Sequence, residues 1–281
     1  PNTVAFEYNN IENLKSKIEL LKKNNTSNIY AIILEPFSAS CMQGCSDKFL
    51  LELRKICFEN DIVLIFDEVY SGWAKTGELF NFMRVKNLCP DILTSSKSFG
   101  GGKASISAYI SSDKVFMKAY GSAGDANLHS STYTGFGEES ATALEALDIM
   151  VQENYVDKSK NIFERINPKL IELKNKYPSI IKEVRGSGTM NGIVINPPMK
   201  IIDKIVDLLP FTVAKNNYNK FSLIVIAGIM EYLYSTFNIL TIPQDRIIRT
   251  EQGDIERFAY LAIKPSCIVN EQEIDFFVDS L

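Results

Sequence analysis

The amino-acid sequence predicts an α/β fold followed by a smaller α+β domain, and three observations lead to this expectation. Helix-like and strand-like segments alternate through the first half of the chain, as they do when parallel strands are joined by crossover helices. Polar residues gather where the apolar strands stop. A long helical stretch, residues 138–176, then separates this half from a region with its own strand pair and closing helix.

The elements of the first half follow from the spacing of their apolar residues. Apolar side chains recur every three or four positions over residues 10–23, whereas residues 62–66 are wholly apolar, as in a strand buried on both faces. The expected helices cover residues 10–23 and 47–59, and the expected strands cover residues 29–34, 62–66, 92–94 and 106–110. Ligands of open α/β sheets bind outside the carboxyl ends of the strands, so we expect the chemistry near Glu35, Asp67 and the segment that follows Asp91.

The long helical stretch has one interruption, near Asn154, and we expect it to connect two domains. The predicted domains are residues 1–155 and residues 156–281. The second domain is expected to contain strands over residues 181–185 and 190–195, an amphipathic stretch from Ile201 and a helix after Asn270.

Composition and charge restrict the class of protein. Hydrophobic residues make up 46% of the chain and charged residues 23%, values that are typical of a soluble globular protein and exclude a disordered or fibrous one. The 30 Lys and Arg residues are scattered and are outnumbered by 34 Asp and Glu, so we expect no binding to nucleic acid. The longest apolar runs fall well short of the roughly 20 residues of a membrane helix, so we expect no membrane span.

The cysteine and histidine content predicts a reducing compartment and no zinc site. Five cysteines are an odd number, thinly spread, which is the opposite of a secreted disulfide framework. Cys41 and Cys45 form a close pair, but the single histidine, His129, is far from them in sequence. The N-terminal residues lack the pattern of a signal peptide. We therefore expect a cytoplasmic protein.

The acidic pair Asp67 and Glu68 directly follows the second apolar strand, and this pattern has three explanations. A nucleotide hydrolase holds magnesium in this way, but it also needs a phosphate loop. The Gly102-Lys103 pair does not supply one, because the preceding glycine and the following hydroxyl residue of such a loop are missing. The second explanation is that both carboxylates only solvate the strand end, and the third is a cofactor site.

A lysine just past the next strand favours the cofactor site. Lys97 precedes three consecutive glycines, residues 100–102, which suits an amine that touches a bound cofactor while the backbone turns sharply beside it. A pyridoxal phosphate site needs an amine that bonds to the cofactor's aldehyde and a carboxylate that keeps the pyridine nitrogen protonated. Lys97 and Asp67 fit these roles. Lys103 is a second candidate amine, and a solvated surface lysine is the alternative for Lys97.

Four segments resemble the class-III aminotransferases and occur in the order of that family. They are residues 67–77, 90–102 and 129–135 and the Arg-Gly motif of residues 185–188. The resemblance, which runs from about Ile32 to Gly192, implies a pyridoxal phosphate enzyme of fold type I. Residues 1–155 would be part of a three-layer αβα large domain that binds the cofactor, and residues 156–281 would be a connecting helix and a smaller C-terminal domain. A homodimer with shared active sites, a small-molecule amino donor and an oxo acceptor are also implied.

The same resemblance implies roles for single residues. Lys97 would be the Schiff-base lysine and later the base that moves a proton to or from the substrate carbon, and Asp67 would pair with the pyridine nitrogen. Val69 would pack on the cofactor ring. Tyr70 stands where the family usually has Gln, and its phenol can still donate a hydrogen bond to the cofactor's ring oxygen. Thr132 matches the threonine that reaches the cofactor phosphate of the neighbouring subunit.

The sequence departs from the family pattern near its C-terminus. Many members bind the substrate carboxylate with an Arg shortly before a Pro-Pro pair, whereas this chain has Leu261 near that position. Glu35 matches the acidic residue that often pairs with this Arg, and we expect it to face an amino group of the substrate instead. Lys264 and Arg249 are candidate substitutes for the Arg. An amine donor without a carboxylate near the reacting carbon, such as a sugar, a polyamine or a secondary-metabolite intermediate, is therefore favoured.

The family's N-terminal portion, which supplies a Gly-Ser or Gly-Thr phosphate loop and a ring that stacks on the cofactor, has no counterpart in this sequence. The sequence is the C-terminal part of a longer enzyme, or another polypeptide supplies the missing elements, or the chain no longer turns over. We predict a pyridoxal phosphate-dependent aminotransferase that acts through Lys97. The alternatives are an aminomutase or decarboxylase on the same scaffold and a non-catalytic scaffold or partner subunit.

Overall fold

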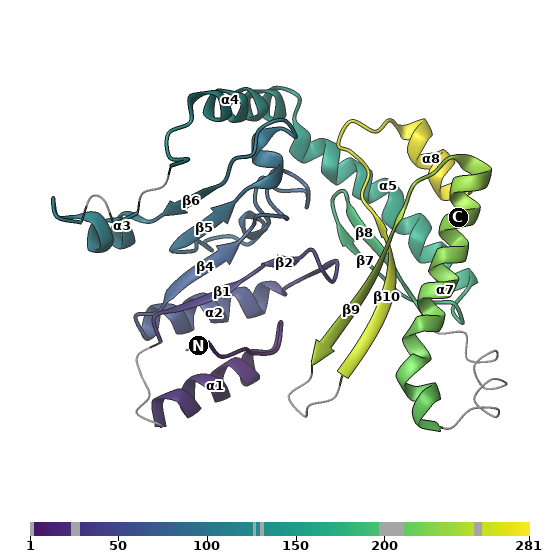
Figure 1. Ribbon diagram of the computed structural model, residues 1–281, viewed down its shortest axis with the longest axis horizontal. Coiled ribbons are helices and arrows are strands. Elements are labelled where there is room, and N and C mark those ends of the chain that lie inside the picture. Colours follow the sequence, from purple (N-terminus) through teal and green to yellow (C-terminus); the bar gives the residue numbers. More distant parts are fainter. Residues whose placement is uncertain (1–2, 24–28, 126–127, 130–131, 197–210, 250–254) are drawn as a thin grey trace. The chain divides into compact units, whose positions relative to one another are not determined.

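The computed structural model describes residues 3–23, 29–125, 128–129, 132–196, 211–249 and 255–281 (Figure 1). Judged by their contacts, the residues form two compact units, each with its own hydrophobic core. Unit 1 consists of Pro1–Ala39, Gly44–Ala74 and Glu78–Val156, and unit 2 consists of Ser40–Gln43, Lys75–Gly77 and Asp157–Leu281.

Within the described residues, the main sheet of unit 1 has the strand order β1-β4-β5-β6 (Figure 1). Its strands are β1 (Ala31–Leu34), β4 (Val63–Asp67), β5 (Ile92–Ser95) and β6 (Ala108–Ser111). The first three run parallel, as predicted, but β6 pairs with β5 in the antiparallel direction. The only helix described between β5 and β6 is the one-turn 3-10 helix η2 (Lys97–Gly100), which is too short to carry the chain back across the sheet for a parallel pairing.

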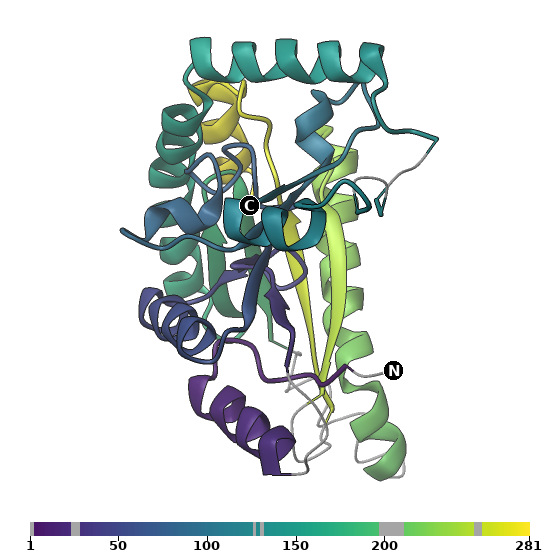
Figure 2. The same ribbon diagram turned by 90° about the vertical axis from the view of Figure 1, so that its left-hand side faces the viewer.

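The helices of unit 1 are α1 (Ile11–Lys23), α2 (Asp47–Glu59), α3 (Asp113–Tyr120) and α4 (Gly137–Gln152), and the shorter elements are β2 (Phe37–Ser38), β3 (Gln43–Gly44) and the 3-10 helix η1 (Asn81–Arg84). The helices α1 and α2 bury apolar residues in the same core as this sheet, whereas α3 has no buried residue. The α2 helix begins after Ser46, whose hydroxyl accepts a hydrogen bond from the Phe49 N–H at 3.2 Å. Its residues Leu53 and Cys57 are buried in the same core as Leu64 of β4. The α1 helix lies beside α2 (Figure 2).

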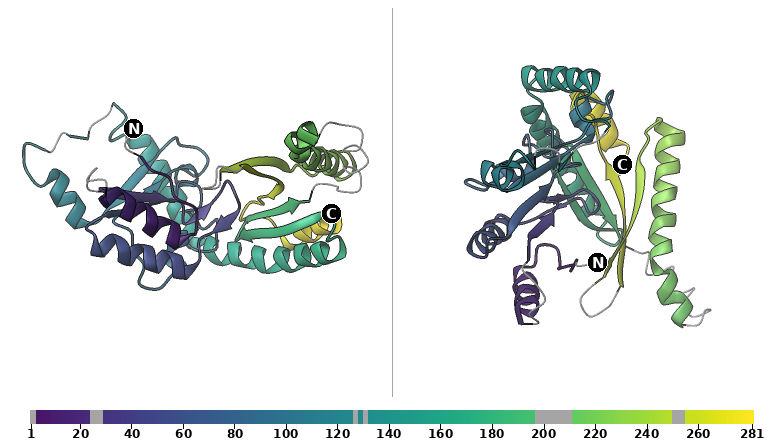
Figure 3. Two further views of the ribbon diagram at one scale, coloured as in Figure 1. Left: turned by 90° about the horizontal axis from the view of Figure 1, so that it is seen from below. Right: turned by 60° about the vertical axis from the view of Figure 1, so that its left-hand side comes forward.

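In the second half of the chain, the described residues form an antiparallel sheet and three helices. The elements are α5 (Tyr155–Lys176), β7 (Ile181–Ser187), β8 (Met190–Ile195), α7 (Phe211–Phe237), β9 (Ile242–Arg249), β10 (Ile255–Ile263) and α8 (Glu271–Asp279). The strand order is β7-β8-β10-β9. Alternate residues of β10, namely Ala259, Leu261 and Ile263, are buried in one core with apolar residues of α5, α7 and α8. The α7 helix runs along the β9–β10 pair (Figure 3).

The structure confirms the predicted helices and strands up to residue 195, with ends shifted by a few residues. Asn154, with a φ of 51°, lies at the predicted interruption between α4 and α5. The closing helix α8 begins with a capping box, in which Asn270 and Glu273 exchange two hydrogen bonds of 2.9 Å. The short elements β2, β3 and η1, the helix α3 and the strands β9 and β10 were not predicted. Residues 201–210 of the predicted amphipathic stretch lie outside the described residues. Over the described part of the chain, none of the helices has the length and apolarity needed to cross a membrane.

Candidate active site

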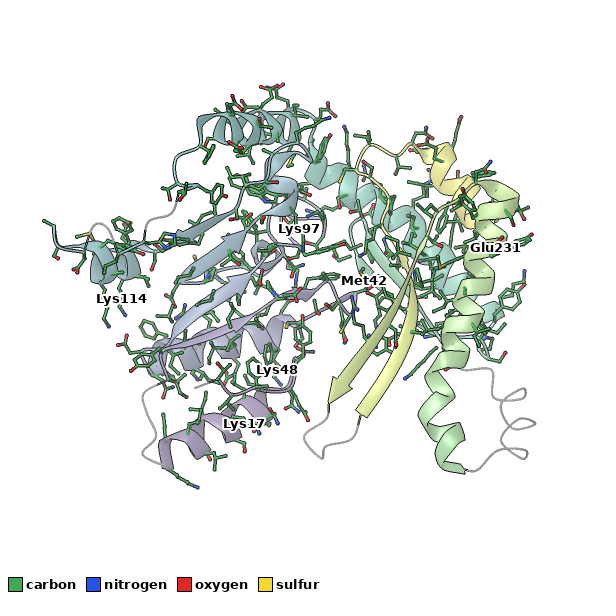
Figure 4. All side chains as sticks on the ribbon, in the orientation of Figure 1. Lys17, Met42, Lys48, Lys97, Lys114 and Glu231 are labelled. Carbon is green, nitrogen blue, oxygen red and sulfur yellow. The ribbon has the colours of Figure 1, made fainter. Side chains whose placement is uncertain are left out.

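Charged side chains follow three neighbouring strands of unit 1 at the point where each strand ends. Glu35 follows β1, and Asp67 is the last residue of β4. Lys97, which is labelled in Figure 4, lies two residues beyond the end of β5. Because these strands are parallel and adjacent, their carboxyl ends lie at one edge of the sheet. The fold therefore brings two carboxylates and one amine to the same edge.

The carboxylate of Asp67 is held by two hydrogen-bond donors. Its Oδ1 accepts a hydrogen bond of 3.0 Å from the Val69 N–H and one of 3.3 Å from the Thr94 hydroxyl. Thr94 is the residue of β5 that lies opposite Asp67 in the strand register. Thr94 was not among the predicted site residues, although it lies in the segment that carries the family resemblance. These bonds fix the direction of a half-buried carboxylate at the strand end.

The side chain of Lys97 is exposed, and its amine lies over an aromatic ring. Lys97 Nζ is 4.0 Å from the centroid of the Tyr70 ring. The lysine is the first residue of η2 and has a φ of 53°, a left-handed conformation that is uncommon for residues other than glycine. Strained backbone of this kind is concentrated at functional sites, where the surrounding structure holds it.

The glycines that follow Lys97 allow η2 to pack closely against α4. Gly101 has a φ of 59°, and a Cβ atom at this position would lie 2.8 Å from the Cβ of Ala146. Gly102 has a φ of 73°, but a Cβ atom there would meet nothing within 4 Å. Gly101 is therefore required by both its backbone conformation and its neighbour, whereas Gly102 is required by its conformation alone.

Glu35 is a half-buried carboxylate whose charge interacts with the other two groups. Its Oε2 accepts a hydrogen bond of 3.0 Å from the Ala39 N–H. Burial raises the pKa of Glu35, the Ala39 hydrogen bond opposes this effect, the charge of Asp67 raises the pKa further and the charge of Lys97 lowers it. Glu35 is therefore close enough to Asp67 and Lys97 for their charges to act on its carboxylate.

Glu68 does not solvate the strand end, because its side chain is fully buried. Its carboxylate accepts hydrogen bonds from the Ser71 hydroxyl at 2.9 Å, the Asn81 N–H at 2.7 Å and the Phe82 N–H at 2.8 Å. Burial raises the pKa of Glu68, while the two backbone N–H groups and the hydroxyl lower it. Glu68 thus joins the turn after β4 to the start of η1, and the explanation of this residue as a solvated acid is wrong.

An aromatic cluster connects the turn after β4 to η2. The Trp73 ring stacks on the Phe99 ring with centroids 5.0 Å apart and an interplanar angle of 6°, and it meets Phe80 edge-on at 4.9 Å. The Trp73 indole N–H also donates a hydrogen bond of 2.7 Å to the Ser95 hydroxyl. These contacts hold the segment that carries Asp67 and the segment that carries Lys97 against each other.

The other predicted residues lie elsewhere. Thr132 is exposed on the segment between α3 and α4. Leu261 is buried in the core of unit 2, and Lys264 is half-buried just after β10. The side chain of Arg249 lies outside the described residues.

Comparisons with known proteins place the sequence among aminotransferases. Residues 1–210 match the family model described as aminotransferase class-III. An acetylornithine aminotransferase of Synechocystis sp. is 32% identical over 190 residues, which cover 67% of this chain and 42% of that protein. An ornithine aminotransferase of Macrococcus caseolyticus is 32% identical over 191 residues, which cover 68% of this chain and 44% of that protein. The chain thus spans less than half the length of these curated relatives.

Solved transaminase structures share the fold. An acetylornithine aminotransferase from Elizabethkingia anophelis has a TM-score of 0.71 at 21% identity, and the match covers 100% of this chain and 59% of that chain. An ornithine delta-aminotransferase of Plasmodium falciparum has a TM-score of 0.70 at 21% identity, with coverage of 100% and 59%.

Proposed function

Because this chain belongs to the class-III aminotransferase family and has the fold of type-I pyridoxal phosphate transferases, we propose that it binds pyridoxal phosphate and transfers an amino group from an amine donor to an oxo acceptor. One observation carries this proposal. The amine of Lys97 and the carboxylate of Asp67 lie at the carboxyl ends of adjacent parallel strands. This pair is the chemical minimum for holding the cofactor by its aldehyde and by its ring nitrogen.

The side chains at this edge fit the cofactor in their chemistry. A carboxylate held by the Val69 N–H and the Thr94 hydroxyl suits a protonated ring nitrogen, and the exposed amine of Lys97 suits an aldehyde carbon. Val69 would pack on the face of the ring, and the Tyr70 hydroxyl would donate to the ring oxygen. When bound, pyridoxal phosphate withdraws electrons from the substrate carbon that bears the amino group.

Lys97 would have two tasks in this reaction. While bonded, its amine would hold the cofactor in the site. When a substrate amine takes its place, the freed amine would act as the base that removes a proton from the substrate carbon and delivers it to the C4′ carbon of the cofactor. Asp67 would hold a proton on the ring nitrogen throughout, because a fixed negative charge favours the protonated form of that nitrogen.

Membership of this family also leads us to propose a domain division and a homodimer. Residues 1–155 would be the cofactor-binding part and residues 156–281 the small domain, and the presence of two separate hydrophobic cores supports this division. Thr132, exposed on its loop, would reach the cofactor phosphate of a second subunit in a homodimer. A cytoplasmic location is supported by five free cysteines.

We propose that the amine donor carries its reacting amino group away from any carboxylate. Curated relatives are named for ornithine and acetylornithine, and one solved relative is named for the delta position of ornithine. The delta carbon of ornithine bears no carboxylate, which agrees with Leu261 standing where many family members have the Arg that binds a carboxylate. Glu35, whose carboxylate lies in the same electrostatic environment as Lys97, would face the second amino group of such a diamine.

A non-catalytic partner subunit of the same fold is the second candidate function. It is compatible with the observation that the given sequence matches 42% and 44% of the length of two curated relatives. In that case, another polypeptide would supply the phosphate-binding element that the longer relatives carry in residues without a match here. The two candidates differ in whether this chain alone bonds to the cofactor.

The test is a borohydride reduction of the purified protein after incubation with pyridoxal phosphate. We expect visible absorbance and a stable adduct that peptide mass spectrometry locates on Lys97. Lys97→Arg should abolish the adduct, and Lys103→Arg, which changes an exposed lysine beyond the glycines, should retain it. A colourless wild-type protein without an adduct would reject cofactor bonding by this chain and favour the partner-subunit function.

A further inference from the structure

The amine of Lys97 lies over the face of the Tyr70 ring. We propose that Tyr70 is a positioning residue that holds this amine on the face of its ring whenever the amine is not bonded, an inference that rests on the proposed function of Lys97. The distance of 4.0 Å from Nζ to the ring centroid is well within the range at which an ammonium is attracted by an aromatic face. This role belongs to the ring and is separate from any hydrogen bond that the hydroxyl makes.

The backbone turn that carries Tyr70 is held by buried contacts. This turn is closed by a hydrogen bond of 3.0 Å from the Gly72 N–H to the Glu68 carbonyl oxygen. A Cβ atom at Gly72 would lie 2.8 Å from that oxygen and 2.9 Å from the Phe80 ring, so the turn has no room to move inward. The buried Glu68 carboxylate also accepts hydrogen bonds from the backbone N–H groups of Asn81 and Phe82. The ring is therefore presented by a rigid segment.

The backbone of Lys97 is held against the same segment. Phe99, two residues after the lysine, stacks on Trp73, three residues after the tyrosine, at 5.0 Å. Ser95, two residues before the lysine, accepts the hydrogen bond from the Trp73 indole. The two chain segments are thus locked together on both sides of Lys97, and the contact between the amine and the ring follows from this lock.

A ring suits this task better than a carboxylate would. Asp67 Oδ1 already accepts two hydrogen bonds, and Glu35 Oε2 accepts one from the backbone. The attraction of an exposed ammonium to a ring shifts an equilibrium by only about two- to fivefold, so the amine can leave the ring easily when it is needed. The glutamine that the family usually has at position 70 offers no ring face.

Competitive labelling of the amines tests the proposal without cofactor. Cofactor-free protein is treated with a small amount of acetic anhydride at one pH, and the labelling of Lys97 is divided by that of Lys48, an exposed lysine on α2 (Figure 4). An amine reacts only when neutral, and the ring attracts only the ammonium. We therefore expect Tyr70→Leu to raise the ratio about two- to fivefold and Tyr70→Phe to leave it unchanged.

The variants separate the ring from the hydroxyl and from the fold. If Tyr70→Phe behaves like Tyr70→Leu, or if Tyr70→Leu matches the wild type, the proposal is wrong. Tyr70→Gln provides a second variant without a ring, and it should match Tyr70→Leu even if the latter folds poorly. An adduct on Lys97 with an unchanged ratio would overturn this inference alone. A raised ratio without any adduct would overturn the proposed function and leave the contact with the ring standing.

Discussion

At the scale of single residues, Glu35 gives the site a pH dependence that stability measurements detect. Burial is the largest effect on its pKa and raises it above 4.5, the usual value for a glutamate. We expect Glu35→Gln to be more stable than the wild type at pH 7, because the amide keeps an oxygen for the Ala39 N–H and carries no charge that must be buried. Urea unfolding of both proteins between pH 4 and pH 8 measures the difference.

The sign follows from proton linkage. Because the pKa of Glu35 is higher in the folded protein than in the unfolded chain, the unfolded chain loses its proton first as the pH rises. The contribution of Glu35 to the free energy of unfolding is therefore complete below pH 4.5 and decreases through the window above it. Glu19→Gln, at an exposed position of α1, serves as the control. A Glu35→Gln variant less stable at pH 7 would show that the charge of Lys97 outweighs burial.

The positions of site residues were predictable where an ionisable residue follows an apolar strand, and not where a side chain depends on partners far along the chain. Lys97 and Asp67 could be selected because each follows an apolar strand. The burial of Glu68 could not be, because its partners Asn81 and Phe82 come from a turn 13 and 14 residues further along the chain. For Tyr70, the sequence indicated a hydroxyl donor, whereas the contact of its ring with Lys97 depends on the packing of two segments.

At the scale of elements, local signals predicted the helices better than the strands of unit 2. The α2 helix has its predicted bounds, since Ser46 caps its start and Asn60 closes its end with local hydrogen bonds. The strand β9 contains Pro243 and charged residues, which argue against a strand in any position except a sheet edge. It is an edge strand, and its pairing with β10, the next strand along the chain, reveals it.

The packing of η2 on α4 leads to a prediction for two adjacent glycines. We expect Gly102→Ala to lower the free energy of unfolding by about 1–2 kcal/mol, the usual penalty for a left-handed alanine. Gly101→Ala should lower it by a further ~1–3 kcal/mol, because its Cβ would also lie 2.8 Å from that of Ala146. Urea unfolding gives both values.

The same two variants test whether the packing of η2 on α4 positions Lys97. Displacement of η2 moves the backbone of Lys97, so Gly101→Ala should reduce the fraction of protein that forms the borohydride-stable adduct, whereas Gly102→Ala should retain most of it. Equal losses in the two variants would mean that backbone conformation alone matters and that the contact with α4 does not position the lysine.

At the scale of the whole molecule, the two compact units are not continuous in sequence. Segments 40–43 and 75–77 lie in the first half of the chain but have their contacts in unit 2. The Thr189 N–H donates a hydrogen bond of 2.9 Å to the Lys75 carbonyl oxygen, and the Ser187 hydroxyl donates one of 2.8 Å to that of Thr76. Trp73 and Ala74, with φ values of 61° and 65°, turn the chain just before this segment. Contacts across more than 100 residues have no local signal, so the sequence could not predict them.

Gly188 is the residue on which the attachment of segment 75–77 depends most closely. It has a φ of 58°, and a Cβ atom there would lie 2.4 Å from the Lys75 carbonyl oxygen and 2.4 Å from the Ser159 hydroxyl. Gly188→Ala therefore places an alanine in a left-handed conformation and also creates a clash that only a shift of the backbone can relieve. We expect the free energy of unfolding to fall by roughly 2–5 kcal/mol. Gly228→Ala, in the middle of α7 with nothing within 4 Å, should instead add about 0.5–1 kcal/mol.

Hydrogen exchange distinguishes a local release of the segment from a general loss of stability. In Gly188→Ala, the amides of residues 75–77 should exchange faster than those of β8 by more than the change in global stability explains, because the substitution displaces the atoms that hold this segment. Since residues 75–77 continue directly from the turn that carries Asp67, Tyr70 and Trp73, a released segment should also lower the yield of the adduct on Lys97. Equal acceleration of exchange at all amides would contradict a local release of residues 75–77. It would mean that Gly188→Ala only lowers the global stability.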